Sequence, residues 1–256
     1  MPSKQQWAAL LALTCVSACA PSAFRAHAGA AFVRVNGDMG LQNSGGGLTL
    51  NQNMNDLRDD LQSGETEATP YLRVEMDWGK QRFKVSGFGH SSAGSGTLGG
   101  DFGDIPSGST VQSDTDFFNV TGSWSYDLMP SSLLRLAPGV QLGYYGLDVS
   151  TRSQALTAFE EVETDLIVPM PYLEAEVDLG YVAVQANVGI MSLDAGDADG
   201  RYWDAEALAI LRPADGFELI GGFRYLLIDA HGTASSRDFD TDLDIFGFFL
   251  GGGISF

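Results

Sequence analysis

The sequence predicts an all-β chain, an antiparallel up-and-down sheet of ten strands that closes into a transmembrane β-barrel, with eight strands as the alternative. Three observations predict it. Ten segments alternate between apolar and polar side chains, and the connections between them alternate between short and long. The last segment, 246–256, places every even-numbered side chain on one apolar or glycine face. With 256 residues and 32 glycines, the chain suits many strands joined by turns.

The N-terminal segment is expected to be a removed export signal that precedes the sheet. Lys4 supplies a positive charge, an apolar run follows from Trp7 to Ala20, and Ala26-His27-Ala28 has the small-x-small form that signal peptidase cuts. The run is shorter than the roughly 20 residues that a membrane-spanning helix needs. We therefore expect residues 1–28 to be a signal peptide and residues 29–256 to form a single barrel domain.

A second processing route stays open, because Val16-Ser17-Ala18-Cys19 is similar to the lipobox of bacterial lipoproteins. Cleavage there would leave a lipid-modified Cys19 at the N-terminus, whereas cleavage after Ala28 removes both Cys15 and Cys19 and with them any disulfide. In the second case, 12 Lys and Arg would face 33 Asp and Glu, for a net charge of −21. Such an acidic surface repels phosphate groups, which argues against nucleic acid as a partner.

Period-two alternation predicts each strand in turn. It is clearest in the fourth segment, where Phe118, Val120 and Trp124 share one face while Asn119 and Thr121 share the other. The second and seventh segments show the same pattern, and a helical period explains none of the three. In chain order the expected strands are 30–41, 69–78, 82–92, 116–128, 133–149, 162–178, 181–193, 201–211, 217–230 and 240–256.

The connections distinguish a barrel from a secreted β-sandwich, the soluble alternative. Membrane barrels have short periplasmic turns, longer external loops and an even strand number that leaves both termini periplasmic, whereas a sandwich has no reason for this parity. In the first long connection, Met54, Leu57 and Leu61 either form a short helical turn or fold over the rim. The short connections are 79–81, 129–132, 179–180 and 212–216, and the long ones are 42–68, 92–115, 150–161, 194–200 and 231–239.

The end of the chain, Gly251-Gly252-Gly253-Ile254-Ser255-Phe256, resembles the last strand of Gram-negative outer-membrane β-barrel proteins. With the export signal and the loop parity, this resemblance covers residues 30–256 as an architecture. It implies contact with outer-membrane lipids and lipopolysaccharide, and a terminal Phe256 that the barrel-assembly machinery recognises. The omptin proteases of this class also use ten strands, but strand number alone assigns no protease activity.

If the apolar faces meet lipid, the opposite faces line a lumen that carries charges of both signs. Barrels of about eight strands are filled by their own side chains, and open channels belong to about 16 or more. We therefore expect a plugged interior in which Arg135 and Arg224 each lie near a carboxylate, because an unpaired buried charge is strongly unfavourable. The expected charge network consists of Arg73, Glu75, Lys84, Arg135, Glu174, Glu176, Glu206, Glu218 and Arg224.

Two further groups of residues were weighed as sites. His90 and Ser92 share one strand face and resemble the pair of the lipid A deacylase barrels, but the orienting acid that activates such a pair is not visible. Asp194, Asp197 and Asp199 offer oxygen ligands that suit divalent cations, yet their spacing matches no calcium loop, so a solvated acidic rim explains them better. No catalytic site, metal site or cofactor is assigned.

The sequence thus predicts a small, non-enzymatic integral outer-membrane protein with an envelope-structural or surface-interaction role. A narrow channel for small solutes and a lipid-modifying enzyme are the two alternatives within the same fold.

Overall fold

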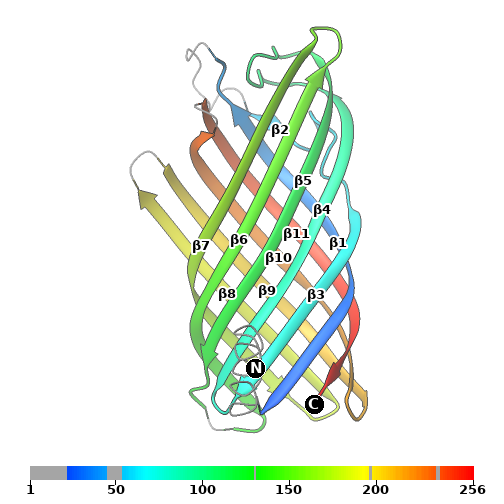
Figure 1. The fold of residues 1–256 in the computed structure, drawn as a ribbon, viewed down its shortest axis with the longest axis vertical. Helices are drawn as coiled ribbons and strands as arrows, with labels where there is room; N and C mark the ends of the chain where they lie inside the picture. The colour runs from blue at the N-terminus through cyan, green and yellow to red at the C-terminus, as the bar shows by residue number, and fades with distance from the viewer. Residues whose placement is uncertain (1–21, 45–53, 130, 196–197, 235–236) are drawn as a thin grey trace, which may run out of the picture.

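The computed structural model describes residues 22–256 except 45–53, 130, 196–197 and 235–236 (Figure 1). This part of the chain is all-β and antiparallel, as expected from the alternation, and it contains no helix long and apolar enough to cross a membrane. Its strands are β1 (Ala23–Leu41), β2 (Asn55–Asp56), β3 (Glu67–Trp78), β4 (Gln81–Thr97), β5 (Thr110–Tyr126), β6 (Leu134–Ser153), β7 (Ala158–Asp178), β8 (Val182–Ala195), β9 (Ala198–Ala214), β10 (Phe217–Ala234) and β11 (Arg237–Ser255).

The sheet closes on itself. Each strand from β3 to β10 pairs with the next in the chain, β1 pairs with β3, and β11 returns to pair with β1 (Figure 1). The described residues form eleven strands, where ten were expected. The additional one, β2, has two residues, pairs with Asp38 and Met39 of β1, and lies inside the expected first loop.

Both described ends of the chain lie at one end of this ring, which we call the terminal end; the opposite end is the loop end (Figure 1). The backbone amide of Phe24 donates to the carbonyl of Phe256 at 2.7 Å, and the amide of Phe256 donates back to Phe24 at 3.0 Å. The strands run further toward the loop end than expected. The connection expected over 150–161 reduces to residues 154–157, between β6 and β7.

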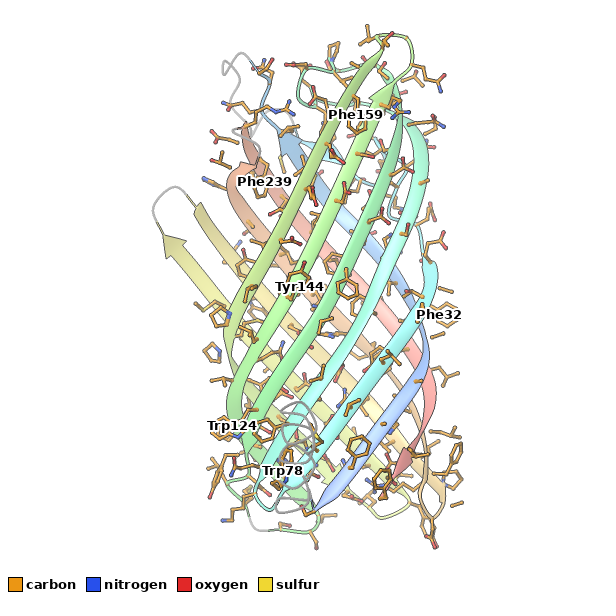
Figure 2. The ribbon with its side chains drawn as sticks, in the orientation of Figure 1. Phe32, Trp78, Trp124, Tyr144, Phe159 and Phe239 are labelled. Atoms are coloured by element: carbon orange, nitrogen blue, oxygen red, sulfur yellow. The ribbon has the colours of Figure 1, made fainter. Side chains whose placement is uncertain are left out.

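An apolar belt surrounds the half of the ring near the terminal end. Outward side chains there are large and exposed, among them Phe118, Leu142 and Leu250. In Figure 2, Trp78 and Trp124 lie near the terminal end, while Phe32 and Tyr144 lie at mid-height. The outward face of β11 from Phe246 to Phe256 spans about 33 Å along the strand, which a strand tilt of about 40° converts to a height of about 25 Å.

Nearer the loop end the pattern reverses, and this explains the longer strands. Outward side chains are carboxylates, whereas inward side chains such as Val149 and Leu243 are apolar and fully buried. A strand with a polar outer face and an apolar inner face follows the rule for sheets in water. We call the outward carboxylates of β5, β6 and β7 in this half the acidic wall: Asp114, Asp116, Asp148, Glu161, Glu163 and Asp165.

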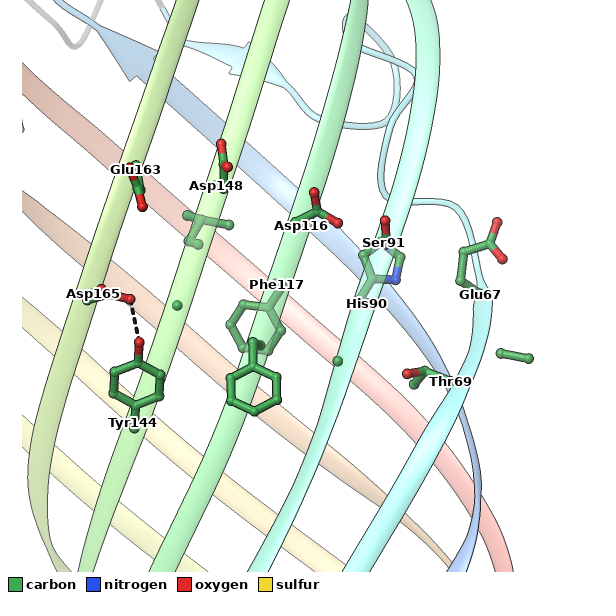
Figure 3. Close-up of a pocket in the computed structure, with 15 residues that line it drawn as sticks. Glu67, Thr69, His90, Ser91, Asp116, Phe117, Tyr144, Asp148, Glu163 and Asp165 are labelled. Carbon is green, nitrogen blue, oxygen red and sulfur yellow. Dashed lines mark hydrogen bonds between the residues drawn. The ribbon is translucent and has the colours of Figure 1, made fainter.

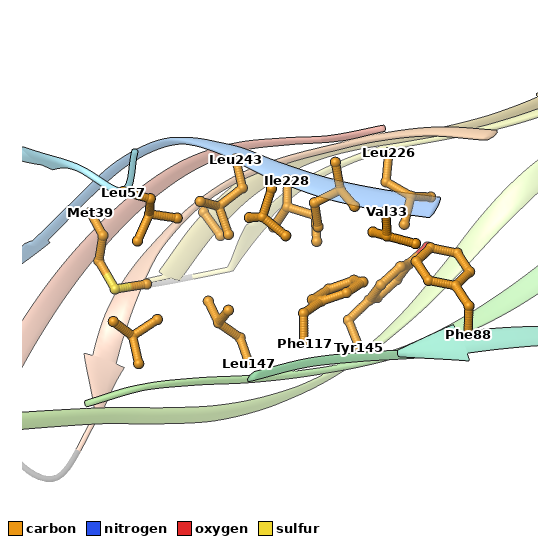
Figure 4. Packing of buried hydrophobic residues seen from close by; sticks show 14 of the residues in the cluster. Val33, Met39, Leu57, Phe88, Phe117, Tyr145, Leu147, Leu226, Ile228 and Leu243 are labelled. Atoms are coloured by element: carbon orange, nitrogen blue, oxygen red, sulfur yellow. The ribbon is translucent and has the colours of Figure 1, made fainter. Parts of the chain in front are cut away.

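Inside the same half, buried apolar side chains from opposite walls meet and fill the ring (Figure 4). Leu226, Ile228 and Leu243 face Phe117, Tyr145 and Leu147 across the interior, and Met39 and Leu57 lie toward the loop end. We call this cluster the apolar plug.

Residues 55–64, which we call the insert, complete the wall where β3 is missing. Because β3 begins at Glu67, it does not reach the loop-end halves of β1 and β4. The insert lies between these strands: the amide of Leu57 donates to Gly37 at 2.9 Å, and the amide of Val35 donates to Gly64 at 3.2 Å. Leu57 and Leu61 are fully buried, so they anchor the insert in the interior, and neither belongs to a helix.

Candidate functional site

The strands place the expected charge network inside the belt-enclosed half of the ring. Successive side chains of a strand alternate between its two faces, so an apolar residue that faces outward puts its charged neighbours into the interior. Arg135 keeps partial exposure, and the other eight residues of the predicted network are buried: Arg73, Glu75, Lys84, Glu174, Glu176, Glu206, Glu218 and Arg224.

Arg73 spans the interior from β3 to the opposite wall. Its Nε donates to Glu75 Oε1 on the same strand at 2.7 Å. Its two terminal nitrogens donate to Glu206 of β9 and to the amide oxygen of Gln185 on β8. The side chain is fully buried, and its hydrogen bonds reach groups across the lumen and beside it.

A second crossing joins β4 to β6 and β7. Arg82 donates to Glu174 Oε1 at 2.9 Å and also to Glu176, while the Nζ of Lys84 donates to the hydroxyl of Tyr172 at 2.5 Å. Arg135 of β6 lies 3.2 Å from the same Glu174 carboxylate. Glu174 therefore accepts hydrogen bonds from cations of two strands.

Arg224 makes a third crossing, from β10 to β4 and β5. Its Nε donates to Asp204 Oδ1 at 2.8 Å, and its terminal nitrogens reach Ser86 Oγ at 3.4 Å and Thr121 Oγ1 at 3.0 Å. The guanidinium also lies 5.6 Å from the ring centre of Phe88. Arg135 and Arg224 thus each lie against an interior carboxylate.

The network continues to the terminal end around Glu218, which lies apart from the three crossings. His27 Nε2 lies 2.8 Å from Glu218 Oε2, and Arg212 Nε donates to Glu218 Oε1 at 3.0 Å. Arg25 Nη1 donates to Glu75 Oε2 at 3.1 Å, which connects this group to the first crossing.

Sequence reasoning left four basic residues out of the network. Arg82 and Arg212 lie near strand ends. Each is an even number of positions from an inward residue of its own strand, Lys84 and Glu206 respectively. This spacing could have placed both arginines inside. Arg25 and His27 were assigned to the removed signal peptide, yet the structure places both inside β1.

His90 and Ser92 are neighbours on the inward face of β4, and His90 Nε2 lies 3.0 Å from Ser92 Oγ. The amide of Gly64 in the insert donates to the same hydroxyl at 2.7 Å, so Ser92 also fixes the insert in place. Within the described part of the chain, no carboxylate is hydrogen-bonded to His90. The pair therefore lacks the orienting acid of a nucleophile triad.

A hollow of about 480 Å³ lies on the outer wall beside this pair (Figure 3). Its lining combines the edge of the belt with the acidic wall. Tyr144 donates a hydrogen bond to Asp165 Oδ1 at 2.7 Å, while Asp116, Asp148 and Glu163 lie above. With its acidic rim and apolar floor, the hollow lies at the boundary between the two halves of the ring.

The two described candidate metal ligands lie on different strands. Asp194 of β8 and Asp199 of β9 are paired across the two strands, and Asp197 lies outside the described residues. Across the residues that the structure describes, no group of three or more His, Cys, Asp or Glu side chains is arranged to hold a metal ion.

Like charges face one another across the acidic wall. Asp148 is paired with Asp116 on β5 and with Glu163 on β7, an arrangement that is unfavourable between adjacent strands. Partial burial, followed by the charges of Glu161, Asp116 and Glu163, raises the pKa of Asp148.

Replacing Asp148 by Asn should therefore raise the unfolding temperature at neutral pH. When folding raises the pKa of a carboxyl, the protonated carboxyl stabilises the folded state. This stabilisation is complete below the pKa of the unfolded state and is lost as the pH rises through the pKa of the folded state. The gain should shrink below the ordinary Asp pKa of about 4. Thermal melts at both pH values measure it, with Asp215→Asn in an exposed turn as the control. An equal or lower melting temperature at pH 7 would contradict the repulsion.

Comparison with known proteins identifies the fold. No protein-family model matches the sequence, and no curated protein matches it. The structure is similar to the outer membrane protease OmpT from Escherichia coli, with a TM-score of 0.56 and 9% identity over 93% of this chain and 97% of that one.

Two further solved structures show weaker similarity. Neisserial surface protein A has a TM-score of 0.38 and 13% identity over 92% of this chain and 99% of that one. The Pseudomonas putida toluene transporter TodX has a TM-score of 0.34 and 9% identity over 93% and 91%. The similarity to OmpT is one of fold, and it confirms the resemblance to bacterial outer-membrane β-barrel proteins as a broad class.

Proposed function

We propose that the chain is a small, non-enzymatic integral protein of the bacterial outer membrane with an envelope-structural or surface-interaction role. The apolar belt, whose height matches the apolar band of such barrels, faces lipid. The terminal end, with the short turns, lies in the periplasm, and the acidic wall stands outside the membrane. Outer-membrane lipids and lipopolysaccharide contact the belt, and the outward Phe256 is available to the barrel-assembly machinery.

The closed interior is the observation that carries this proposal. Charged side chains cross the belt-enclosed half from β3 to β9, from β4 to β7 and from β10 to β5, and the apolar plug fills the other half. A solute would have to break buried ion pairs and then displace packed apolar side chains. Two barriers in series disfavour the narrow-channel alternative and leave the outer surfaces and the loop end as the places where the protein acts.

Catalysis at His90 and Ser92 is not part of the proposal. Both side chains are buried, Ser92 is bound to the backbone of the insert, and no orienting carboxylate of the described residues is hydrogen-bonded to the histidine. Divalent cations at the acidic loops are proposed as partners, since oxygen-rich carboxylate groups suit them.

The folded protein should give no single-channel steps in a planar bilayer bathed in concentrated potassium chloride. Insertion is checked by heat-modifiable migration of the same sample. The Arg73→Met variant should also stay closed, because the apolar plug remains when the first crossing is lost. Reproducible steps from the wild-type protein would overturn the plugged interior and favour the channel.

A further inference from the structure

The first six residues of β1 are part of the closed wall. Ala23 to Ala28 pair with Asp77 to Leu72 of β3, and Arg25 to Ala28 also pair with Ser255 to Gly252 of β11. Four of the 17 residue pairs that join β1 to β11 in the described chain lie in this stretch, at the terminal end of the pairing. The stretch therefore closes the belt at the level where the outer face is apolar.

Side chains of the same stretch add to the closure. The ring of Phe24 stacks on Phe256 with 5.1 Å between centroids, next to their reciprocal backbone hydrogen bonds. Two residues before Phe24, the Ser22 hydroxyl donates to the carbonyl of Asp77 at 2.9 Å and accepts from the amide of Gly79 at 3.3 Å. Ser22 thus contacts both β3 and the β3–β4 turn.

Arg25 and His27 balance interior carboxylates. Arg25 lies 3.1 Å from Glu75 and 3.6 Å from Asp77, and His27 is buried against Glu218 at 2.8 Å. Without these two residues Glu218 would keep only Arg212, and Glu75 only Arg73, within the described contacts. Removing one partner of a buried charge pair is strongly unfavourable.

Cleavage after Ala28 would remove all of these contacts. It would leave Leu72 to Asp77 and Gly252 to Ser255 as two facing backbone edges without a strand between them. Each unsatisfied backbone group in lipid is unfavourable by several kcal/mol, and an open sheet edge does not occur facing the hydrocarbon region. The small-x-small motif at Ala26-His27-Ala28 thus lies within a segment that the closed barrel requires.

We propose that the export leader is removed between Ala18 and Ser22, so that Ser22 to Ala28 remain in the mature protein. The sequence there offers small residues for either peptidase route, Ala18-Cys19-Ala20 for signal peptidase and Val16-Ser17-Ala18-Cys19 for the lipoprotein route. Either cut leaves all of β1 in place, with at most a few residues ahead of it.

Intact mass and N-terminal sequencing of the folded protein, purified from outer membranes after expression of the full chain, test the cut. A mature N-terminus between Cys19 and Ser22 supports the proposal, and a lipid adduct on Cys19 identifies the lipoprotein route. A mature chain that begins at Gly29 overturns it.

A substitution in the disputed segment gives an independent test. His27→Gln should shift the mass of the mature protein by the difference between the two side chains and lower its unfolding temperature. Lys4→Gln, which lies in the removed leader under every route, should change neither. If His27→Gln yields a mature protein of unchanged mass, the segment has been removed and the proposal fails, whatever the stability.

Discussion

Replacing Arg73 by methionine should lower the free energy of unfolding by about 3 to 5 kcal/mol, the range for breaking a buried ion pair. The guanidinium is fully buried and joins Glu75, Glu206 and Gln185, groups from three strands on two walls of the ring. Methionine keeps much of the volume but removes the charge and every donor. Glu206 and Glu75 would then remain as buried carboxylates that have each lost a partner.

Urea unfolding in detergent micelles, followed by tryptophan fluorescence, measures this loss. The matched control is Arg201→Met, because Arg201 also pairs with a carboxylate, that of Asp229 at 2.6 Å, but is 69% exposed. Exposed pairs contribute about 0 to 1 kcal/mol, so the two arginines should differ by several kilocalories per mole. Equal effects would show that the interior pairs are solvated and that the lumen is wet.

Replacing Gly94 by valine should release the insert from the interior. A Cβ atom at Gly94 would lie 1.9 Å from the carbonyl oxygen of Gln62, a distance that no side-chain adjustment relieves, because the obstacle is backbone. If the insert moves out, Leu57 and Leu61 become exposed. Each leucine would then lose about 1.5 to 3 kcal/mol of stabilisation from burial. This is more than a single hydrogen bond of the segment contributes.

Limited proteolysis reports this release directly, because trypsin can cleave after Arg58 only when the insert is locally unfolded. We expect cleavage at Arg58 to become at least tenfold faster in Gly94→Val, since about 1.4 kcal/mol changes an opening equilibrium tenfold. Ala93→Val is the control, because Ala93 points outward on the same strand. Unchanged cleavage at Arg58 would mean that the insert is not held against β4.

The sequence predicts the belt-enclosed half of the molecule well, because the alternation of side chains between the two faces of a strand governs it. Once Val74 and Leu72 are placed outward, strand geometry puts Arg73 and Glu75 inside. Parity within a strand does not, however, tell which carboxylate on the far wall Arg73 will meet. That pairing depends on the stagger of the closed ring, which places β3 opposite β8 and β9.

The other half could not be predicted from the same rule, because its polarity is reversed. Asp114 and Glu161 look like loop residues when strands are expected to carry apolar outward faces. As a result, β5 and β7 were expected to begin too late and β6 was expected to end too early. Cleavage after Ala28 stays a prediction, and the case against it rests on contacts that the sequence does not show. A small-x-small motif is local, whereas the contacts of His27 and Arg25 join residues 191 and 50 positions away in the chain.

The pairing of β1 with β11 also sets a condition on how the protein folds. The two strands that close the ring stand at opposite ends of the chain, so their contact has a very high sequence separation and a correspondingly unfavourable loop-closure entropy. From β3 to β11, each pairing joins consecutive strands and can form as a hairpin, while the pairing of β1 with β3 spans only the segment that holds β2. Until β11 has been delivered to β1, the nascent sheet carries two open edges, each a template for pairing with another chain. Among the described pairings, closure at β1 and β11 therefore carries the largest loop-closure cost, and the chain is most exposed to aggregation before this pairing forms.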